Sequence, residues 1–241
     1  MIALIRIPVL GLCFIIVNII FLLACIVRPF HRNNVQLGSR LYSSLSVILG
    51  LKLDIRVPES VRSGGPFVYI GNHQNTFDIF TICGATQAGT VSVGKKSLVW
   101  IPIFGWVYWL SGNILIDRTN TNRASNTLKL AARKIRERRL SVWIFPEGTR
   151  SNGKGLLPFK TGAFRLAKLT NEPVVMICAS SLHNKVKWNR WNNGTLIIEM
   201  SEPVVMDESL DLKGWTKYFH QQMSENIQRI DAEVAQLDKA G

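Results

Sequence analysis

The sequence predicts an α/β domain that follows an apolar N-terminal segment. Short apolar runs alternate with amphipathic runs of helical period between residues 66 and 237, an alternation typical of α/β domains. Residues 7–27 form a separate stretch of 21 residues without a charged side chain. A chain of 241 residues, 47% of them hydrophobic, is long enough for a sizeable core and too apolar for intrinsic disorder.

Six short apolar runs predict strands. They are rich in β-branched and aromatic residues, and several end at Gly, Pro or Asp, as strands in a buried sheet do. The expected strands are residues 66–70, 90–94, 113–117, 141–145, 173–179 and 195–200.

Five further runs predict helices. Residues 122–139 place apolar side chains on one face and basic side chains on the other, and residues 215–237 repeat apolar residues at helical spacing. The other expected helices are residues 76–85, 101–110 and 161–169. No internal repeat is visible.

The N-terminal apolar stretch is long enough to cross a bilayer core of roughly 30 Å. A second apolar stretch, residues 41–53, is too short to span and is expected to lie in the interface or to return as the second arm of a helical hairpin. We therefore expect residues 1–53 to be membrane-anchoring helical segments and residues 54–241 to form a separate α/β domain. A cleaved signal peptide is a weaker alternative, because Arg6 is the only basic side chain before the stretch. A buried core helix is disfavoured by the length of the uncharged run.

The net charge of +13 is unevenly distributed. Residues 1–53 carry +5, residues 54–93 carry −1, residues 94–170 carry +12 and residues 171–241 carry −3. This excess requires an anionic partner: nucleic acid, an anionic membrane or a phosphorylated substrate. Apolar, Gly and Pro segments interrupt the basic third, which favours a shaped pocket over a nucleic-acid surface. Three arginines follow the apolar stretch and indicate a cytoplasmic C-terminal part.

Residues 72–78, Asn-His-Gln-Asn-Thr-Phe-Asp, follow an expected strand, where α/β folds place ligand sites. An imidazole is a suitable general base near neutral pH, and a carboxylate can fix its tautomer. His73 and Asp78 are five residues apart, so they can meet only if His73 lies in the turn and Asp78 in the first helical turn. The alternative is a helix N-terminus with an incidental histidine.

No residue is placed as an obvious covalent nucleophile. The chain has no G-x-S-x-G elbow, and its four cysteines include no C-x-x-C pair and no convincing catalytic thiol. The unpaired cysteines also exclude a disulfide scaffold and fit a reducing compartment. A His–Asp pair alone suits deprotonation of a substrate hydroxyl that attacks an activated ester directly.

A second group of polar residues follows another expected strand, in residues 145–151, Phe-Pro-Glu-Gly-Thr-Arg-Ser. A glycine permits close backbone approach, a hydroxyl donates a hydrogen bond, and a guanidinium matches a phosphate. A carboxylate repels a phosphate, so Glu147 is not expected to touch one directly. We expect Glu147 to organise the loop or to hold Arg150. The other candidates for phosphate binding are Arg118, Gly148, Thr149, Arg150 and Lys160. Each basic residue alone could be ordinary surface charge.

These blocks, in this order, resemble the bacterial 1-acyl-sn-glycerol-3-phosphate acyltransferases (lysophosphatidic acid acyltransferases), glycerolipid acyltransferases with an H-x-x-x-x-D motif. The similarity covers nearly the whole chain and includes residues 94–98, 100–105, 116–118 and 157–162. One departure is Met176, which stands where the family's fourth block usually has a proline. It affects only the local wall of the site, since Met fills apolar gaps.

The resemblance implies a mixed central sheet flanked by helices, glycerol-3-phosphate acyltransferase-like, preceded by a membrane-embedded helical hairpin. It implies that His73 deprotonates the sn-2 hydroxyl of lysophosphatidic acid, that Asp78 orients His73, and that acyl-CoA or acyl-carrier protein donates the acyl chain to give phosphatidic acid. Arg118, Glu147, Gly148, Thr149, Arg150 and Lys160 would form the substrate site. No metal, cofactor or nucleic acid is expected, and the place of action is the inner leaflet of the bacterial cytoplasmic membrane, with the catalytic domain in the cytoplasm.

Two rival functions remain open. Within the enzyme class, the acceptor could be glycerol 3-phosphate or another lysolipid. Outside it, the chain could be a non-catalytic basic lipid-binding or nucleic-acid-binding protein.

Overall fold

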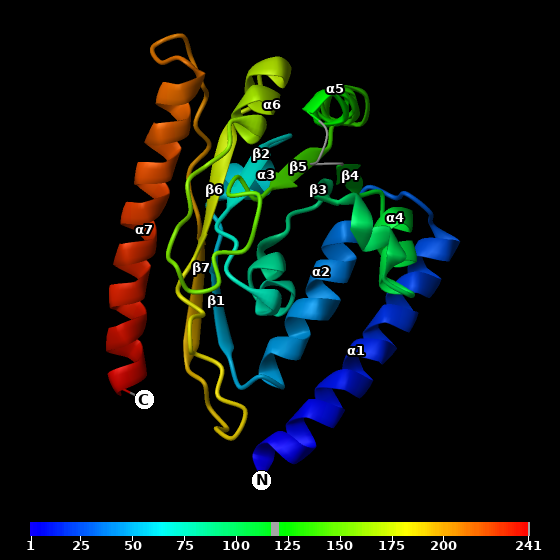
Figure 1. Cartoon of the computed structure of the whole chain (residues 1–241), viewed down its shortest axis with the longest axis vertical. Helices are drawn as coiled ribbons and strands as arrows, with labels where there is room; N and C mark the ends of the chain where they lie inside the picture. Colours follow the sequence, from blue (N-terminus) through cyan, green and yellow to red (C-terminus); the bar gives the residue numbers. More distant parts are fainter. Residues whose placement is uncertain (117–120, 241) are drawn as a thin grey trace.

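The computed structural model describes residues 1–116 and 121–240, and its centre is one seven-stranded sheet (Figure 1). The strand order is β1-β7-β6-β2-β5-β3-β4. Neighbouring strands run parallel except β6 and β7, so the sheet is mixed. The strands are β1 (Lys52–Arg56), β2 (Val68–Gly71), β3 (Thr90–Lys95), β4 (Ile114–Ile116), β5 (Ser141–Ile144), β6 (Val174–Ala179) and β7 (Thr195–Met200).

Helices cover both faces of the sheet and give separate hydrophobic cores on its two sides. The α-helices are α1 (Ile2–Val27), α2 (Asn34–Ser44), α3 (Glu59–Ser63), α4 (Phe104–Leu110), α5 (Thr121–Arg138), α6 (Gly162–Thr170) and α7 (Leu212–Ala240). The 3₁₀ helices are η1 (Leu45–Val47), η2 (Thr76–Phe80), η3 (Ile82–Ala85) and η4 (Lys96–Trp100). In Figure 1, α1, α2 and α4 lie on one side and α7 on the opposite side.

The long helices form because their apolar side chains share one face. On α7, Phe219, Met223 and Ile230 are fully buried against the sheet, as the spacing predicts. On α5, Ala131 and Ile135 are buried in the same core. The expected α/β class is therefore confirmed, with all six expected strands present and β1 in addition.

The first two helices form a hairpin that packs on the rest of the protein. Tyr42 of α2 donates a hydrogen bond of 2.9 Å to Oδ1 of Asn18 in α1, and the Tyr42 ring meets Phe21 edge-on. By length and composition α1 could cross a membrane, and only 22% of its most apolar window is buried. Many large apolar side chains of this helix are therefore exposed, among them Leu12, Ile15 and Leu23.

For residues 41–53 the sequence leaves two expectations, an interfacial segment or the second arm of a helical hairpin. Residues 41–44 end α2, the second helix of the hairpin, and the rest include the η1 turn and the start of β1. Leu45, Leu49 and Leu51 are buried in the protein core, so their hydrophobicity serves packing. Gly50, at φ +70°, makes the turn into β1, which spans the boundary expected at residues 53 and 54.

The expected helix over residues 76–85 is instead two 3₁₀ segments. The backbone leaves the helical region at Thr81 (φ −127°, ψ −89°), between η2 and η3. The Thr81 hydroxyl donates to the carbonyl of Phe77, a local bond of the kind that competes with regular helix.

The carboxyl ends of β2 and β5 create the site. These strands are parallel neighbours near the middle of the sheet, so the segments that follow them emerge side by side. Residues 72–78 follow β2, and residues 145–151 follow β5.

Candidate active site

The turn after β2 is fixed to the end of β6 by two amide side chains. Asn72 is buried, and it both donates to the Ala179 carbonyl and accepts from the Ala179 N–H, each at 2.9 Å. Gln74 donates to the Ser180 carbonyl at 2.8 Å and accepts from the Leu182 N–H at 2.7 Å. Because each amide pairs with backbone on a neighbouring strand end, the turn has little freedom to move.

A capping box places Asp78 in the first turn of η2. The Asn75 side chain accepts from the Phe77 N–H at 2.8 Å, and Asp78 Oδ2 accepts from the Asn75 N–H at 3.3 Å. Asp78 Oδ2 also accepts from the Gln74 N–H at 2.7 Å. Asp78 is buried, so these donors to Oδ2 offset part of the cost of burying its carboxylate, whose Oδ1 has no hydrogen-bond partner among the described residues.

His73 and Asp78 form a direct pair. The distance from His73 Nδ1 to Asp78 Oδ2 is 2.6 Å, with side-chain exposures of 22% and 6%. An ionised carboxylate only accepts, so Nδ1 carries the proton and Nε2 is left as the acceptor of the ring. The condition set by the five-residue spacing is met, with His73 in the turn and Asp78 in the first helical turn.

Phe145 stacks on the His73 ring. The ring centroids are 4.2 Å apart and the planes differ by 14°. Phe145 is the first residue after β5, so the sheet register itself places its ring beside the turn after β2. The hydrogen bond to Asp78 and this stack together restrict the imidazole orientation.

Glu147 is a buried link between the two motifs. One carboxylate oxygen accepts from the His73 N–H at 2.6 Å and the other accepts from the Leu157 N–H at 2.9 Å. Burial raises the pKa of Glu147, and the two N–H donors partly oppose that shift. Of the two expected roles, organising the loop is the one these contacts show, since neither oxygen is bonded to Arg150.

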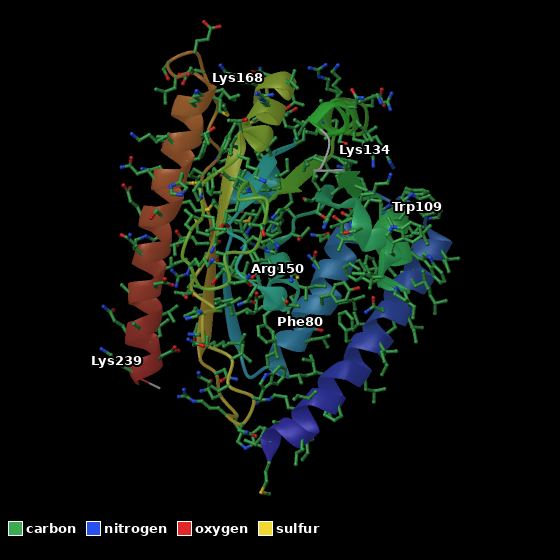
Figure 2. The ribbon with its side chains drawn as sticks, viewed as in Figure 1. Phe80, Trp109, Lys134, Arg150, Lys168 and Lys239 are labelled. Carbon is green, nitrogen blue, oxygen red and sulfur yellow. The ribbon has the colours of Figure 1, made fainter. Side chains whose placement is uncertain are left out.

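The backbone of the second motif pairs with that of the first. The Ser151 N–H donates to the His73 carbonyl, and the Asn152 N–H donates to the Gln74 carbonyl, both at 2.8 Å. Arg150 lies between these pairings and Glu147, exposed, with Nη1 3.2 Å from the Thr76 hydroxyl. Figure 2 shows Arg150 near the middle of the molecule, away from the outer helices.

A cavity of about 240 Å³ opens beside His73. His73, Asp78 and Arg150 contribute to its polar end, and Ile82 and Trp143 are among its apolar walls. A neighbouring cavity of about 150 Å³ shares Phe104, Ile79 and Cys83 with it and continues toward α1 and α2. The arrangement places an imidazole that can accept a proton at the polar end of an apolar hollow.

The structure distributes the remaining candidates over different places. Gly148 and Lys160 line a separate cavity of about 210 Å³, which Phe145 also lines. Gly148 has φ +73°, and a Cβ there would meet the Lys160 side chain at 2.8 Å. Thr149 is exposed in the loop, and Arg118 lies outside the described residues. Within the described ranges, no three His, Cys, Asp or Glu side chains gather as a metal site.

Sequence reasoning assigned no role to three residues that shape the site, namely Asn72, Gln74 and Phe145. An amide directly after a buried strand was the available signal for Asn72. No feature of the sequence indicates that the Phe145 ring stacks on His73, because this contact depends on which strands are neighbours in the sheet.

The chain matches known proteins over most of its length. The Acyltransferase family model matches residues 52–180. The 1-acyl-sn-glycerol-3-phosphate acyltransferase of Haemophilus influenzae is 42% identical, over 98% of this chain and 99% of its own length. That of Escherichia coli is 41% identical over 90% of this chain and 89% of its own length.

A solved structure has the same fold. The crystal structure of the 1-acyl-sn-glycerophosphate acyltransferase from Thermotoga maritima aligns with a TM-score of 0.72 over 95% of this chain and 98% of that chain, at 21% identity. Together with the family match and the bacterial relatives, these findings establish that the chain belongs to the acyltransferase family and is an O-acyltransferase.

Proposed function

We propose that the enzyme transfers an acyl chain to the sn-2 hydroxyl of lysophosphatidic acid, giving phosphatidic acid, with His73 as the general base. The observation that carries the proposal is the 2.6 Å contact between His73 Nδ1 and Asp78 Oδ2 beside an apolar cavity. The names of the relatives from H. influenzae and E. coli support lysophosphatidic acid as the acceptor.

The chemistry follows from the tautomer. Nε2 of His73 accepts the proton of the sn-2 hydroxyl as its oxygen attacks the thioester carbonyl of the donor. The C–S bond then breaks, and the leaving thiolate takes the proton back from the imidazolium. Asp78 stabilises the imidazolium between these steps. No covalent acyl-enzyme is needed.

Arg150 is the phosphate ligand in this proposal. It lines the same cavity as His73, is exposed and has no carboxylate partner among the described residues, so its guanidinium is available for a bidentate contact. Gly148 and Lys160 line the adjoining cavity and would act on the far side of Phe145. The donor's acyl chain would occupy the cavity between Ile82 and Trp143.

The donor is acyl-CoA or acyl-carrier protein, and the site of action is the cytoplasmic face of the bacterial inner membrane. The apolar α1 helix and the bacterial relatives support membrane association. The three arginines that follow α1 support the cytoplasmic orientation.

An acyl-transfer assay with lysophosphatidic acid and each donor type tests the proposal. Purified His73→Ala should lose turnover by roughly 10²- to 10⁴-fold while keeping its fold by circular dichroism. His31→Ala is the matched control, because His31 is an exposed histidine outside the cavity. Near-normal turnover of His73→Ala would refute the mechanism, and turnover only with a different acceptor would refute the substrate.

A further inference from the structure

Three tryptophans form an exposed ridge on one short stretch of chain. Trp100, Trp106 and Trp109 are 83%, 60% and 52% exposed. They are three of the seven tryptophans of the protein, within ten residues. Large apolar side chains that are exposed together in one patch, unlike single ones, mark a surface that meets a partner.

The same stretch is firmly attached on its inner side. Val107 of α4 is 1% exposed and packs in the core shared with α1. Leu98 and Phe104 line the cavity that holds His73. The tryptophan ridge is therefore the outer surface of a wall whose inner surface faces the catalytic histidine.

The ridge continues the apolar surface of α1. Helices α1 and α4 pack against each other, and Phe30, just after α1, meets the Trp109 ring edge-on with centroids 5.1 Å apart. Figure 2 shows Trp109 at the outer edge of the molecule, beside α4 and the C-terminal end of α1. In the last turns of α1, Leu23 and Ile26 are each 58% exposed, so the helix also presents apolar side chains to its surroundings.

Basic side chains occur in the segments that flank this surface along the chain. Lys95 and Lys96 are exposed shortly before Trp100, and Arg32 is exposed in the turn after α1. Indole rings favour the level of lipid head groups, and Lys and Arg beside them attract anionic lipid. This combination fits a bilayer surface better than a second copy of the chain, whose matching surface would carry the same positive charge.

We propose that the tryptophan ridge inserts into the interface of an anionic bilayer, as a membrane contact separate from the α1–α2 hairpin. It holds the wall formed by Leu98 and Phe104 at the lipid surface, so that a lipid substrate reaches His73 without leaving the membrane. The inference rests on the proposed function only in taking the substrates to be membrane lipids.

Fluorescence quenching by brominated lipid tests the contact. Wild type and the variant Trp100→Phe/Trp106→Phe/Trp109→Phe are bound to vesicles of phosphatidylglycerol and phosphatidylcholine with brominated acyl chains. Phenylalanine keeps the surface apolar but removes the indole emission. The quenched part of the emission should fall at least about twofold in the variant, because indoles at the interface are the ones that bromine reaches.

Trp215→Phe is the matched control. Trp215 is buried on α7, on the opposite side of the sheet. Removing it should leave the quenched emission unchanged, so the quenched emission becomes a larger share of the total emission. Equal quenched emission in wild type and the triple Phe variant would overturn the proposal. If a second copy of the chain covers the ridge instead, the quenched emission is also equal in the two proteins. In that case the wild type is a dimer in detergent and the triple alanine variant is a monomer.

Turnover gives a second, independent measurement. The triple variant Trp100→Ala/Trp106→Ala/Trp109→Ala should raise the apparent KM for vesicle-borne lysophosphatidic acid about tenfold or more, since apolar area leaves the bilayer. It should leave turnover of a short-chain, water-soluble acceptor unchanged. Leu169→Ala/Val205→Ala/Leu237→Ala removes comparably exposed apolar groups elsewhere and should change neither. An unchanged KM on vesicles would count against the ridge, whereas absent activity in the wild type would refute the proposed function and leave the quenching result intact.

Discussion

Replacing Phe145 tests whether the ring stack positions His73, the proposed general base. The stack has a centroid distance of 4.2 Å and an interplanar angle of 14°, and such aromatic pairs contribute about 0.5–1.5 kcal/mol beyond their buried area. Phe145→Leu keeps a large apolar side chain but loses the flat ring, so kcat should fall by about 2- to 13-fold if that energy orients the imidazole. Phe145→Ala also joins the cavities on either side of the ring, and its kcat should fall by about 10²-fold, as a displaced catalytic group does.

The assay is steady-state acyl transfer, with kcat and KM measured for each variant and with Phe145→Tyr as the variant that should rescue kcat. Phe159→Leu is the matched control, because Phe159 also contacts a histidine, His220, with centroids 4.9 Å apart, but on the outer helix α7. A general loss of stability would lower the unfolding temperature of both variants and leave kcat of the folded enzyme unchanged. The positioning role is refuted if Phe145→Leu matches wild type, or if only KM changes.

Other predictions concern single groups of the site. Arg150→Lys should raise the KM for lysophosphatidic acid about tenfold with a smaller effect on kcat, because lysine cannot reproduce a bidentate contact; an unchanged KM removes Arg150 from phosphate binding. Burial raises the pKa of Glu147 above its ordinary value of 4.5, so the stability that this group contributes is greatest below that value and is lost as pH rises through the folded-state pKa. Glu147→Gln cannot ionise, so its unfolding temperature relative to wild type should increase from about pH 4 to pH 8, and calorimetry showing the opposite slope would mean that the two N–H donors outweigh burial. Burial also raises the pKa of the Cys83 thiol, so Cys83→Ala should retain acyl transfer within about threefold; a complete loss would point to a covalent acyl-cysteine.

The contact between His73 and Asp78 was predictable because its geometry is local. A five-residue spacing after a strand leaves few ways for His73 and Asp78 to meet, and the capping box supplied by Asn75 realises one of them. The role of Arg150 as a cavity residue was predictable for the same reason, since its motif follows the strand beside β2. Local rules of this kind carry over from sequence to structure without knowledge of the whole fold.

Contacts made across the fold were not predictable. The Glu147 carboxylate is bonded to the N–H of His73, a residue 74 positions away, and residue type alone does not specify such a partner. Lys160 lies in a different cavity from His73 because the path of the chain after the loop depends on tertiary packing. Hydropathy also could not tell the buried leucines of residues 41–53 from lipid-facing ones, because burial in protein and burial in lipid remove the same apolar area from water.

The groups that hold His73 in place differ from those that we propose to contact lipid. His73 is held by the Asp78 contact, the Glu147 bond to its N–H and the Ser151 bond to its carbonyl. All three lie at the sheet edge formed by the carboxyl ends of β2 and β5. Leu98 and Phe104, in the same stretch of chain as the tryptophan ridge, line the cavity beside His73. Changes at the sheet edge should therefore act on kcat with any acceptor, while changes at the ridge should act on KM with vesicle-borne acceptors alone. Combining Phe145→Leu with the triple alanine variant of the ridge should then give additive free-energy effects, because the two groups share no direct contact. A strong coupling between them would mean that the membrane contact also sets the position of His73.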